Sequence, residues 1–267
     1  SNVAAKLGGR MRAAVSGAAA LSPDVTKIFI GLGIPIVQGY GLTETSPVIS
    51  VNPLEDNVPS SVGVPIRETE VKLGEHDELL VQGPGVMLGY WNNHRATTET
   101  IDRDGWLHTG DVAKIEDNHI YITGRIKDIL VLSNGEKIPP GDMEMAIALD
   151  PLIEQVMVVG EGQAYLTALV VLSDESWPAL AKEHGLDAKD PASMEDKKLQ
   201  GVILKRIRLA LNQFPGYAKI RQVTLVAEPW TIEDGLITPT LKVKRARVAE
   251  RYSGEIEKMY SGGPVAG

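Results

Sequence analysis

Residues 37–47, VQGYGLTETSP, bring together several groups that can bind a phosphorylated ligand. Glycines such as Gly41 let a backbone approach a ligand closely. Tyr40 offers a flat face for a purine, Thr43 a hydroxyl donor, and Glu44 a carboxylate of the kind that binds Mg²⁺ beside phosphates. Spacing alone leaves two interpretations open: a nucleotide site, or a loop whose threonine and glutamate merely start a helix.

Four further stretches carry groups suited to other parts of a nucleotide. In the first, Gly17 and Ala18 leave bare backbone on which a flat aromatic ring can pack. Asp111 ends the second stretch, GWLHTGD, and a carboxylate can accept hydrogen bonds from the hydroxyls of a ribose. The third carries Arg125, and the fourth places two lysines in a threonine-bearing turn. These stretches are SGAAAL (16–21), GWLHTGD (105–111), TGRIKD (123–128) and ITPTLKVKR (237–245).

Composition limits the classes of protein to which the chain can belong. A net charge of −8 argues against a general nucleic-acid binder, which would carry a basic face. The absence of cysteine excludes disulfides, thiolate zinc sites and cysteine nucleophiles. The five histidines show no metal-ligand spacing. No apolar run approaches the roughly 18 residues of a membrane-spanning helix.

The first residues of the chain bear on its cellular context. SNVAAKLGGRMRAAVSG lacks the apolar core of a signal peptide, so we expect a cytoplasmic protein. The chain starts at Ser1 without an initiator methionine, which predicts a fragment of a longer polypeptide.

Hydrophobic patterns predict α/β layering at the start of the chain and then a β-rich part. Ser22 is suited to cap a helix between two buried strands. From about Ser60, short alternating strands separated by glycines indicate a small barrel or curled sheet. The expected elements are strands 12–16 and 34–37, helix 23–32, a brief helix 97–101, and a hairpin of strands 106–115 and 119–123.

After GRIKDIL the pattern changes to a second unit of mixed α+β type, which places a domain boundary near residues 125–128. Two adjacent prolines, Pro139 and Pro140, mark the entrance of a helix. The expected elements are helices 141–148, 175–184 and 197–213 and strands 155–159, 166–172 and 223–226. The expected domains are 1–125 (an α/β piece 1–58 and a β-rich subdomain 59–125), 126–260, and a disordered tail 261–267.

Five motifs, in this order along the chain, resemble those of the adenylate-forming superfamily of acyl-CoA synthetases, luciferases and peptide-synthetase adenylation domains. The resemblance covers about residues 12–260 and is strongest to the long-chain fatty acyl-CoA synthetase branch. It implies the end of a large α/β adenylation domain with a small β-barrel subdomain, then a small mobile α+β C-terminal domain. The motifs are GYGLTETSP, GPGVMLGYW, DGWLHTGD, GRIKDILVLSNGEKIPP and TPTLKVKR.

The resemblance implies a two-step reaction with ATP, a fatty acid and CoA as substrates. A long-chain fatty acid would be activated to an acyl-adenylate and then joined to CoA as a thioester, releasing pyrophosphate and AMP. The implied contacts are Gly17 and Ala18 at the adenine, Tyr40 stacked on the purine, Gly41 in the same loop, Thr43 at the α-phosphate, Glu44 on Mg²⁺, and Asp111 and Arg125 on the ribose hydroxyls.

The resemblance also implies a rotation of the C-terminal unit about Lys127. Lys242 would reach the α-phosphate and the carboxylate during adenylation, with Lys244 as the alternative. After rotation, Gly135 would pass close to the pantetheine arm of CoA. The chemistry is reasonable because a carboxylate that attacks ATP brings two anions together, and cations must offset their repulsion.

The superfamily also has a Ser/Thr/Gly-rich phosphate loop ending in Pro-Lys-Gly, which these 267 residues do not contain. We therefore expect the missing N-terminal part of the same polypeptide to be a partner, and the isolated chain to be inactive. Two other functions stay open. A fatty acyl-AMP ligase would load a carrier protein, although the uninterrupted ITGRIKDILVLSNGEK favours CoA. A non-catalytic module would bind nucleotide without turnover.

Structural roles compete with functional ones at several positions. Trp91 and Trp106 are interpreted as core or interdomain packing, and His108 as a strand histidine whose hydrogen bonds are satisfied. The basic run LKVKRARVAER (241–251) is interpreted as a solvated helix face. Its alternatives are binding of CoA phosphate and peripheral contact with an anionic membrane.

Overall fold

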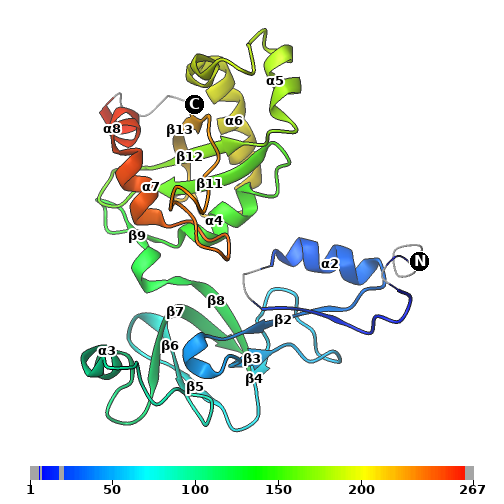
Figure 1. Cartoon of the computed structure of the whole chain (residues 1–267), viewed down its shortest axis with the longest axis vertical. Helices are drawn as coiled ribbons and strands as arrows, with labels where there is room; N and C mark the ends of the chain where they lie inside the picture. The colour runs from blue at the N-terminus through cyan, green and yellow to red at the C-terminus, as the bar shows by residue number, and fades with distance from the viewer. Residues whose placement is uncertain (1–5, 7, 18–20, 262–267) are drawn as a thin grey trace. The chain divides into compact units, whose positions relative to one another are not determined.

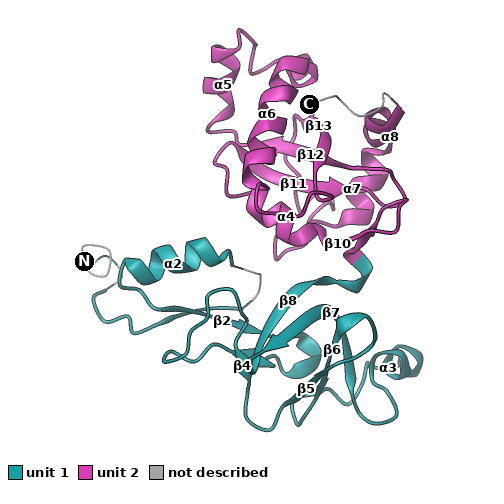
Figure 2. Cartoon of the chain, turned by 180° about the vertical axis from the view of Figure 1, so that it is seen from behind, with its two compact units in different colours: residues 1–127 teal, residues 128–267 magenta. Residues whose placement is uncertain are grey.

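The computed structural model describes residue 6, residues 8–17 and residues 21–261, and the chain divides into two compact units, 1–127 and 128–267 (Figure 2). This division falls inside the segment where the sequence changes pattern. Ala18 and residues 262–267 of the expected tail lie outside the described residues. Ser261, which the sequence assigned to that tail, is instead the last residue of a helix.

The first sheet of unit 1 has the order β1-β2-β3-β4 (Figure 1). The bounds are β1 Ala14–Ser16, α2 Pro23–Gly31, β2 Ile36–Tyr40, β3 Ser50–Val51 and β4 Val64–Pro65. Strands β1 and β2 are parallel, and Ser22 caps α2 as expected, its Oγ accepting a hydrogen bond from the backbone N of Asp24 at 3.3 Å. The sequence ends the second strand at Val37, but β2 continues to Tyr40 because Gly39 and Tyr40 pair with β3.

The second sheet of unit 1 is antiparallel, with the order β5-β6-β7-β8. Its strands are β5 Glu70–Leu73, β6 Glu78–Gln82, β7 Leu107–Glu116 and β8 His119–Arg125, with α3 His94–Thr100 before β7. Asp117 and Asn118 have φ of 48° and 65°, typical of the two-residue turn that joins a hairpin, so the expected hairpin is confirmed. The linear strand order gives a curled sheet instead of a closed barrel.

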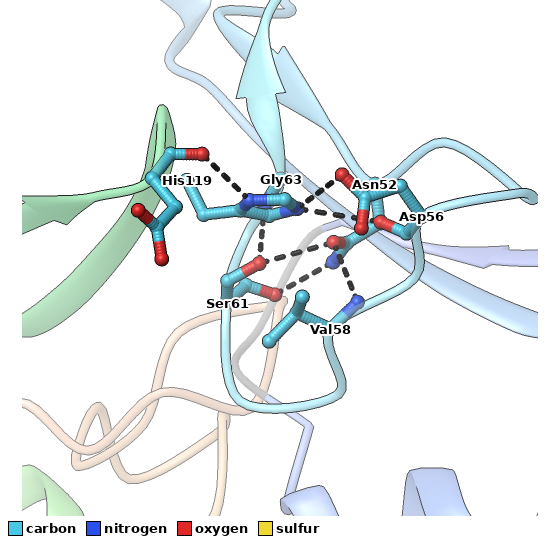
Figure 3. Close-up of polar contacts among 7 residues, drawn as sticks. Asn52, Asp56, Val58, Ser61, Gly63 and His119 are labelled. Carbon is cyan, nitrogen blue, oxygen red and sulfur yellow. Dashed lines mark hydrogen bonds and ion pairs between the residues drawn. The ribbon is translucent and has the colours of Figure 1, made fainter.

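A polar network holds the segment that links β3 to β4 (Figure 3). Asn52 Nδ2 donates to the carbonyl oxygen of Ser61 at 2.7 Å, and Ser61 Oγ donates to Asn52 Oδ1 at 3.0 Å. His119, 4% exposed at the start of β8, places Nε2 3.3 Å from the carbonyl oxygen of Asp56. The network therefore ties this segment to the second sheet.

Unit 2 is built on the sheet β11-β12-β13, with β12 antiparallel to β11 and parallel to β13. All seven residues of β12 are buried, because both faces of the sheet are covered. Val156 and Val158 belong to the core shared with α4 and α6, whereas Met157 and Leu169 belong to the core shared with α7 and α8. Alternation along β11 thus produces two cores, one on each face.

The remaining bounds of unit 2 complete the description. They are β9 Leu130–Val131, β10 Lys137–Ile138, α4 Pro140–Ile147, β11 Ile153–Val159, β12 Leu166–Leu172, α5 Trp177–Glu183, α6 Lys197–Ala210, β13 Ile220–Val226, α7 Arg245–Arg251 and α8 Ser253–Ser261. The sequence pattern did not predict α8. Within the described part of the chain, no helix combines the length and the hydrophobicity that a membrane crossing requires.

Candidate functional site

Three residues that the sequence assigns to a nucleotide meet in one hydrogen-bonded cluster in unit 1. Tyr40 ends β2, Asp111 lies in β7, and Arg125 ends β8, where it pairs with Asp111 in the strand register. Asp111 is 5% exposed. Its Oδ2 accepts a hydrogen bond from Tyr40 Oη at 2.5 Å, and its Oδ1 accepts one from Arg125 Nε at 2.7 Å.

The environment of Tyr40 keeps its phenol protonated. Burial of the ring, followed by the charge of Asp111, raises the pKa of Tyr40 well above its usual value, so the phenol stays neutral and donates. Thr109 Oγ1 accepts a hydrogen bond from the backbone N of Asp111 at 3.1 Å and donates to the carbonyl oxygen of Leu79 at 2.7 Å. The carboxylate is therefore held rigidly, while the Arg125 side chain is 56% exposed.

The loop after β2 requires glycine at position 41. A Cβ built on Gly41 would lie 1.7 Å from the carbonyl oxygen of Pro47, so any side chain would force this loop apart. The next residues form a short 3₁₀ helix, Thr43–Thr45, in which Thr45 Oγ1 accepts a hydrogen bond from the backbone N of Leu42 at 3.0 Å. The close packing of this loop therefore explains why position 41 is glycine, and the close approach of its backbone to a ligand stays a prediction.

Glu44 is oriented by a tyrosine that sequence reasoning did not single out. Tyr90 Oη donates a hydrogen bond to Glu44 Oε1 at 2.9 Å, and the carbonyl oxygen of Glu44 accepts one from the backbone N of Met87 at 2.8 Å. The motif GPGVMLGYW contains Tyr90, but nothing in its spacing indicates a partner 46 residues away.

The described residues contain no group of three or more His, Cys, Asp or Glu that could hold a metal ion on its own. A single oriented carboxylate nevertheless fits Mg²⁺, which usually keeps several waters and binds through one or two carboxylates together with the phosphates of its substrate. Glu44 is the residue in this loop that suits such an ion.

Gly17, also assigned to the adenine site, lies next to β2. A Cβ built there would be 3.4 Å from the carbonyl oxygen of Gly39, in ordinary contact. Its partner in that assignment, Ala18, is outside the described residues.

The groups assigned to the two half-reactions lie in unit 2, and the assigned hinge residue lies where the units meet along the chain. Lys242 is exposed in a tight turn, where its carbonyl oxygen accepts a hydrogen bond from the backbone N of Thr238 at 2.8 Å. Lys244 comes directly before α7. Gly135, with φ of 86°, lies in the turn of the hairpin between β9 and β10, and a Cβ added there would meet no atom within 4 Å. Lys127 is exposed in the 3₁₀ helix Ile126–Asp128.

Acidic partners balance much of the charge of the basic run. Arg245 pairs with Glu144, Arg247 with Glu250, and Arg251 with Glu228 and Asp234. The side chains of Arg247 and Arg251 are 71% and 43% exposed, as expected for a solvated helix face, whereas that of Arg245 is only 20% exposed, so this interpretation is wrong for Arg245.

The other structural interpretations have mixed outcomes. His108 lies in β7 and its Nδ1 is 2.8 Å from Glu78 Oε2 in β6, which confirms a satisfied strand histidine. Trp106 packs under Lys72, whose Nζ is 3.9 Å from the ring centroid. Trp91 is 92% exposed, so core packing is wrong for this residue.

Comparison with known proteins identifies the family. Residues 2–91 match the family model of the AMP-binding enzyme, and residues 127–263 match that of the AMP-binding enzyme C-terminal domain. The chain belongs to the AMP-binding enzyme family. This result confirms the family predicted from the five motifs.

The chain is similar in sequence to ligases whose names specify long-chain fatty acids. It is 35% identical over 262 residues to the long-chain-fatty-acid–CoA ligase FadD15 of Mycobacterium tuberculosis, a match covering 96% of this chain and 43% of that protein. It is 32% identical over 275 residues to the chloroplastic long-chain-fatty-acid–[acyl-carrier-protein] ligase AEE15 of Arabidopsis thaliana, covering 95% and 36%.

A solved structure confirms the predicted fold class. The A domain of carboxylic acid reductase from Segniliparus rugosus, in complex with AMP and a co-purified carboxylic acid, matches with a TM-score of 0.77 and 27% identity, covering 96% of this chain and 40% of that one. The chain thus spans between 36% and 43% of the length of these three proteins.

Proposed function

We propose that the chain forms part of an ATP-dependent long-chain fatty acid–CoA ligase, which makes an acyl-adenylate and then transfers the acyl group to CoA. The observation that supports this best is the cluster of Tyr40, Asp111 and Arg125. It joins three motifs that are far apart in sequence around one rigid carboxylate, in a member of the AMP-binding enzyme family. The similarity to FadD15 supports the choice of acid and acceptor.

In this proposal, unit 1 holds the nucleotide. Asp111 and Arg125 bind the ribose hydroxyls, the face of Tyr40 packs on the purine, and Thr43 contacts the α-phosphate. Gly17, Ala18 and Gly41 supply close backbone. Mg²⁺ bound with ATP would neutralise phosphate charge, and Glu44, oriented by Tyr90, is the residue that would hold it.

Unit 2 supplies one group to each half-reaction. The ammonium of Lys242 offsets the repulsion between the fatty acid carboxylate and the α-phosphate, which is why it matters only while the adenylate forms. The open backbone at Gly135 gives the pantetheine arm of CoA room to pass. Rotation about Lys127 exchanges these two groups between the steps.

A second acceptor is a carrier protein, favoured by the similarity to AEE15. The deciding experiment gives the full-length protein a long-chain fatty acid, ATP and Mg²⁺, with either CoA or a phosphopantetheinylated acyl carrier protein. Pyrophosphate release and the thioester formed are measured. A CoA thioester supports the main proposal, and a thioester on the carrier alone would replace it with the second. If fatty acid causes no pyrophosphate release, both are wrong and a non-catalytic nucleotide-binding module is favoured.

A further inference from the structure

Arg245, the first residue of α7, forms hydrogen bonds to two other elements of unit 2. Its Nη1 donates to Glu144 Oε1 of α4 at 2.6 Å, and its Nη2 donates to the carbonyl oxygen of Val158 in β11 at 2.5 Å. The same carboxylate oxygen of Glu144 accepts a hydrogen bond from the backbone N of Val158 at 2.7 Å. Both charged side chains are only 20% exposed.

This fork fixes one end of the turn that carries Lys242, which lies three residues before Arg245. The other end is fixed by Leu236 and Ile237, which are 4% and 6% exposed in the core beneath α7. Between the two ends, the backbone N of Lys244 donates to the carbonyl oxygen of Leu236 at 2.8 Å. The exposed lysine therefore sits on a turn whose two ends are both anchored.

We propose that Glu144 is a positioning residue for Lys242: by fixing Arg245 at the end of the lysine turn, its carboxylate sets where the lysine ammonium can reach. This inference rests on the proposed function of Lys242 in adenylation. A flexible lysine on a loose turn would visit many positions, and a displacement of about 1 Å can cost about 100-fold in rate.

The chemistry of the pair favours positioning over simple stabilisation. Taking two charges out of water carries a desolvation penalty that their attraction often fails to exceed, so a buried ion pair is weak evidence for stability. Fixing the register of one element against another is the better attested use of such pairs. Glu144 and Arg245 do this for α4, β11 and α7 at once.

A second ion pair in the same unit provides a matched control. Arg206 of α6 donates to both carboxylate oxygens of Asp150, each at 2.7 Å. This pair joins α6 to the segment after α4 and makes no contact with the lysine turn. Asp150→Asn therefore removes a comparable interaction without touching the anchor of Lys242.

The test uses Glu144→Ala, Glu144→Gln and Asp150→Asn in the full-length protein. Adenylation is measured by fatty-acid-dependent exchange of pyrophosphate into ATP, and the second step by thioester formation from supplied acyl-adenylate. Hydrogen exchange of the backbone at residues 238–244 is measured in parallel. We expect Glu144→Ala to lower kcat of adenylation by about 10- to 100-fold, to leave KM for ATP and the thioester step within about twofold, and to speed exchange in the turn.

Glu144→Gln keeps an acceptor for Arg245 and for the backbone of Val158, so it should restore most of the loss. Asp150→Asn should change neither the turn nor the ratio of the two half-reactions. The inference is overturned if both half-reactions fall equally, if Asp150→Asn gives the same split, or if Glu144→Ala leaves exchange in the turn unchanged. Should Glu144→Ala not fold, Arg245→Met takes its place, because it removes both hydrogen bonds of the guanidinium, and unchanged kcat and unchanged exchange in that variant overturn the inference. If Lys242→Ala leaves adenylation intact, the role of Lys242 is wrong, and hydrogen exchange still reports whether Glu144 orders the turn.

Discussion

Lys242 occupies a turn in which Leu241 has φ of 61°, and the described residues offer its side chain no ion pair. An ammonium placed this way can meet anions brought to it, so Lys242→Ala should reduce acyl-adenylate formation by at least about 100-fold. The thioester step from supplied acyl-adenylate should stay within about twofold, because the developing charge is different there. Single-turnover assays of each half-reaction measure both.

The neighbouring lysine is the control for this prediction. Lys244→Ala keeps the backbone hydrogen bond to Leu236, so the turn itself stays intact. We expect a much smaller effect on adenylation than from Lys242→Ala. A reversed order would move the role to Lys244, and equal loss in both half-reactions would remove the role from either lysine.

A second prediction at the scale of single residues concerns Tyr90. Tyr90→Phe removes the hydroxyl that donates to Glu44 at 2.9 Å while keeping the ring. A hydrogen bond to a charged group contributes about 1.5 kcal/mol or more, so the Mg²⁺ concentration for half-maximal adenylation should rise about tenfold or more. Titration of activity with Mg²⁺ tests it, with Trp91→Phe as the exposed neighbour that should change nothing. An unaltered Mg²⁺ dependence in Tyr90→Phe contradicts the orienting role.

At the scale of elements, Asp150 and Arg206 tie the segment after α4 to α6. Burial alone would raise the pKa of Asp150, but hydrogen bonds from Arg206 and from the backbone N of Leu152 outweigh it and hold the pKa below its usual value. A carboxyl whose folded pKa is depressed stabilises the fold fully above its unfolded pKa of about 3.9, and this contribution disappears as pH falls through the folded pKa.

Asp150→Asn should therefore lower Tm by about 2–4 °C at neutral pH. The difference from the unaltered protein should shrink as the pH falls from about 4 through the lower folded pKa of Asp150, below which the carboxyl is protonated in both the folded and the unfolded state. Thermal unfolding at a series of pH values measures it. A difference that stays constant down to strongly acidic pH would show that Asp150 acts through packing instead of charge.

Elements with a clear pattern could be predicted from the sequence, and those decided by pairing could not. The alternating hairpin of β7 and β8 and the apolar strand β12 are where the pattern places them. The extension of β2 was not predictable, because glycine disfavours strands and only pairing with β3 decides it. Helix α8 depends on docking, with Met259 buried and Tyr260 Oη donating to the carbonyl oxygen of Val159 at 3.1 Å.

The candidate site shows the same division. The sequence motifs identified Tyr40, Asp111 and Arg125 as site residues. Their mutual hydrogen bonds form because β2, β7 and β8 bring them together, and this arrangement cannot be read from the order of the residues. Tyr90 and Glu144 were missed because each acts through a residue 46 or 101 positions away along the chain.

At the scale of the whole molecule, the groups assigned to the reaction are divided between two units. Tyr40, Asp111 and Arg125, assigned to the nucleotide, form a hydrogen-bonded cluster in unit 1, whereas Lys242 and Gly135 belong to unit 2. Apolar side chains of α2 are also exposed among the described residues, with Ile28 61% and Ile30 41% exposed. Such a surface predicts association with a further apolar surface when the protein is assembled. Neither unit alone holds every group that the proposed function assigns to the two half-reactions.

Lys127, the last residue of unit 1, is where a change should separate the two half-reactions. Proline at this position fixes φ, removes a backbone donor and restricts Ile126 to extended conformations, so the chain could no longer adopt two orientations freely. We expect Lys127→Pro to reduce the thioester step by about 10- to 100-fold and adenylation by much less. Lys127→Ala keeps a flexible backbone and should leave both steps close to normal. Rapid-quench measurement of each half-reaction decides, and a thioester step that Lys127→Pro leaves unaffected would count against rotation about this residue.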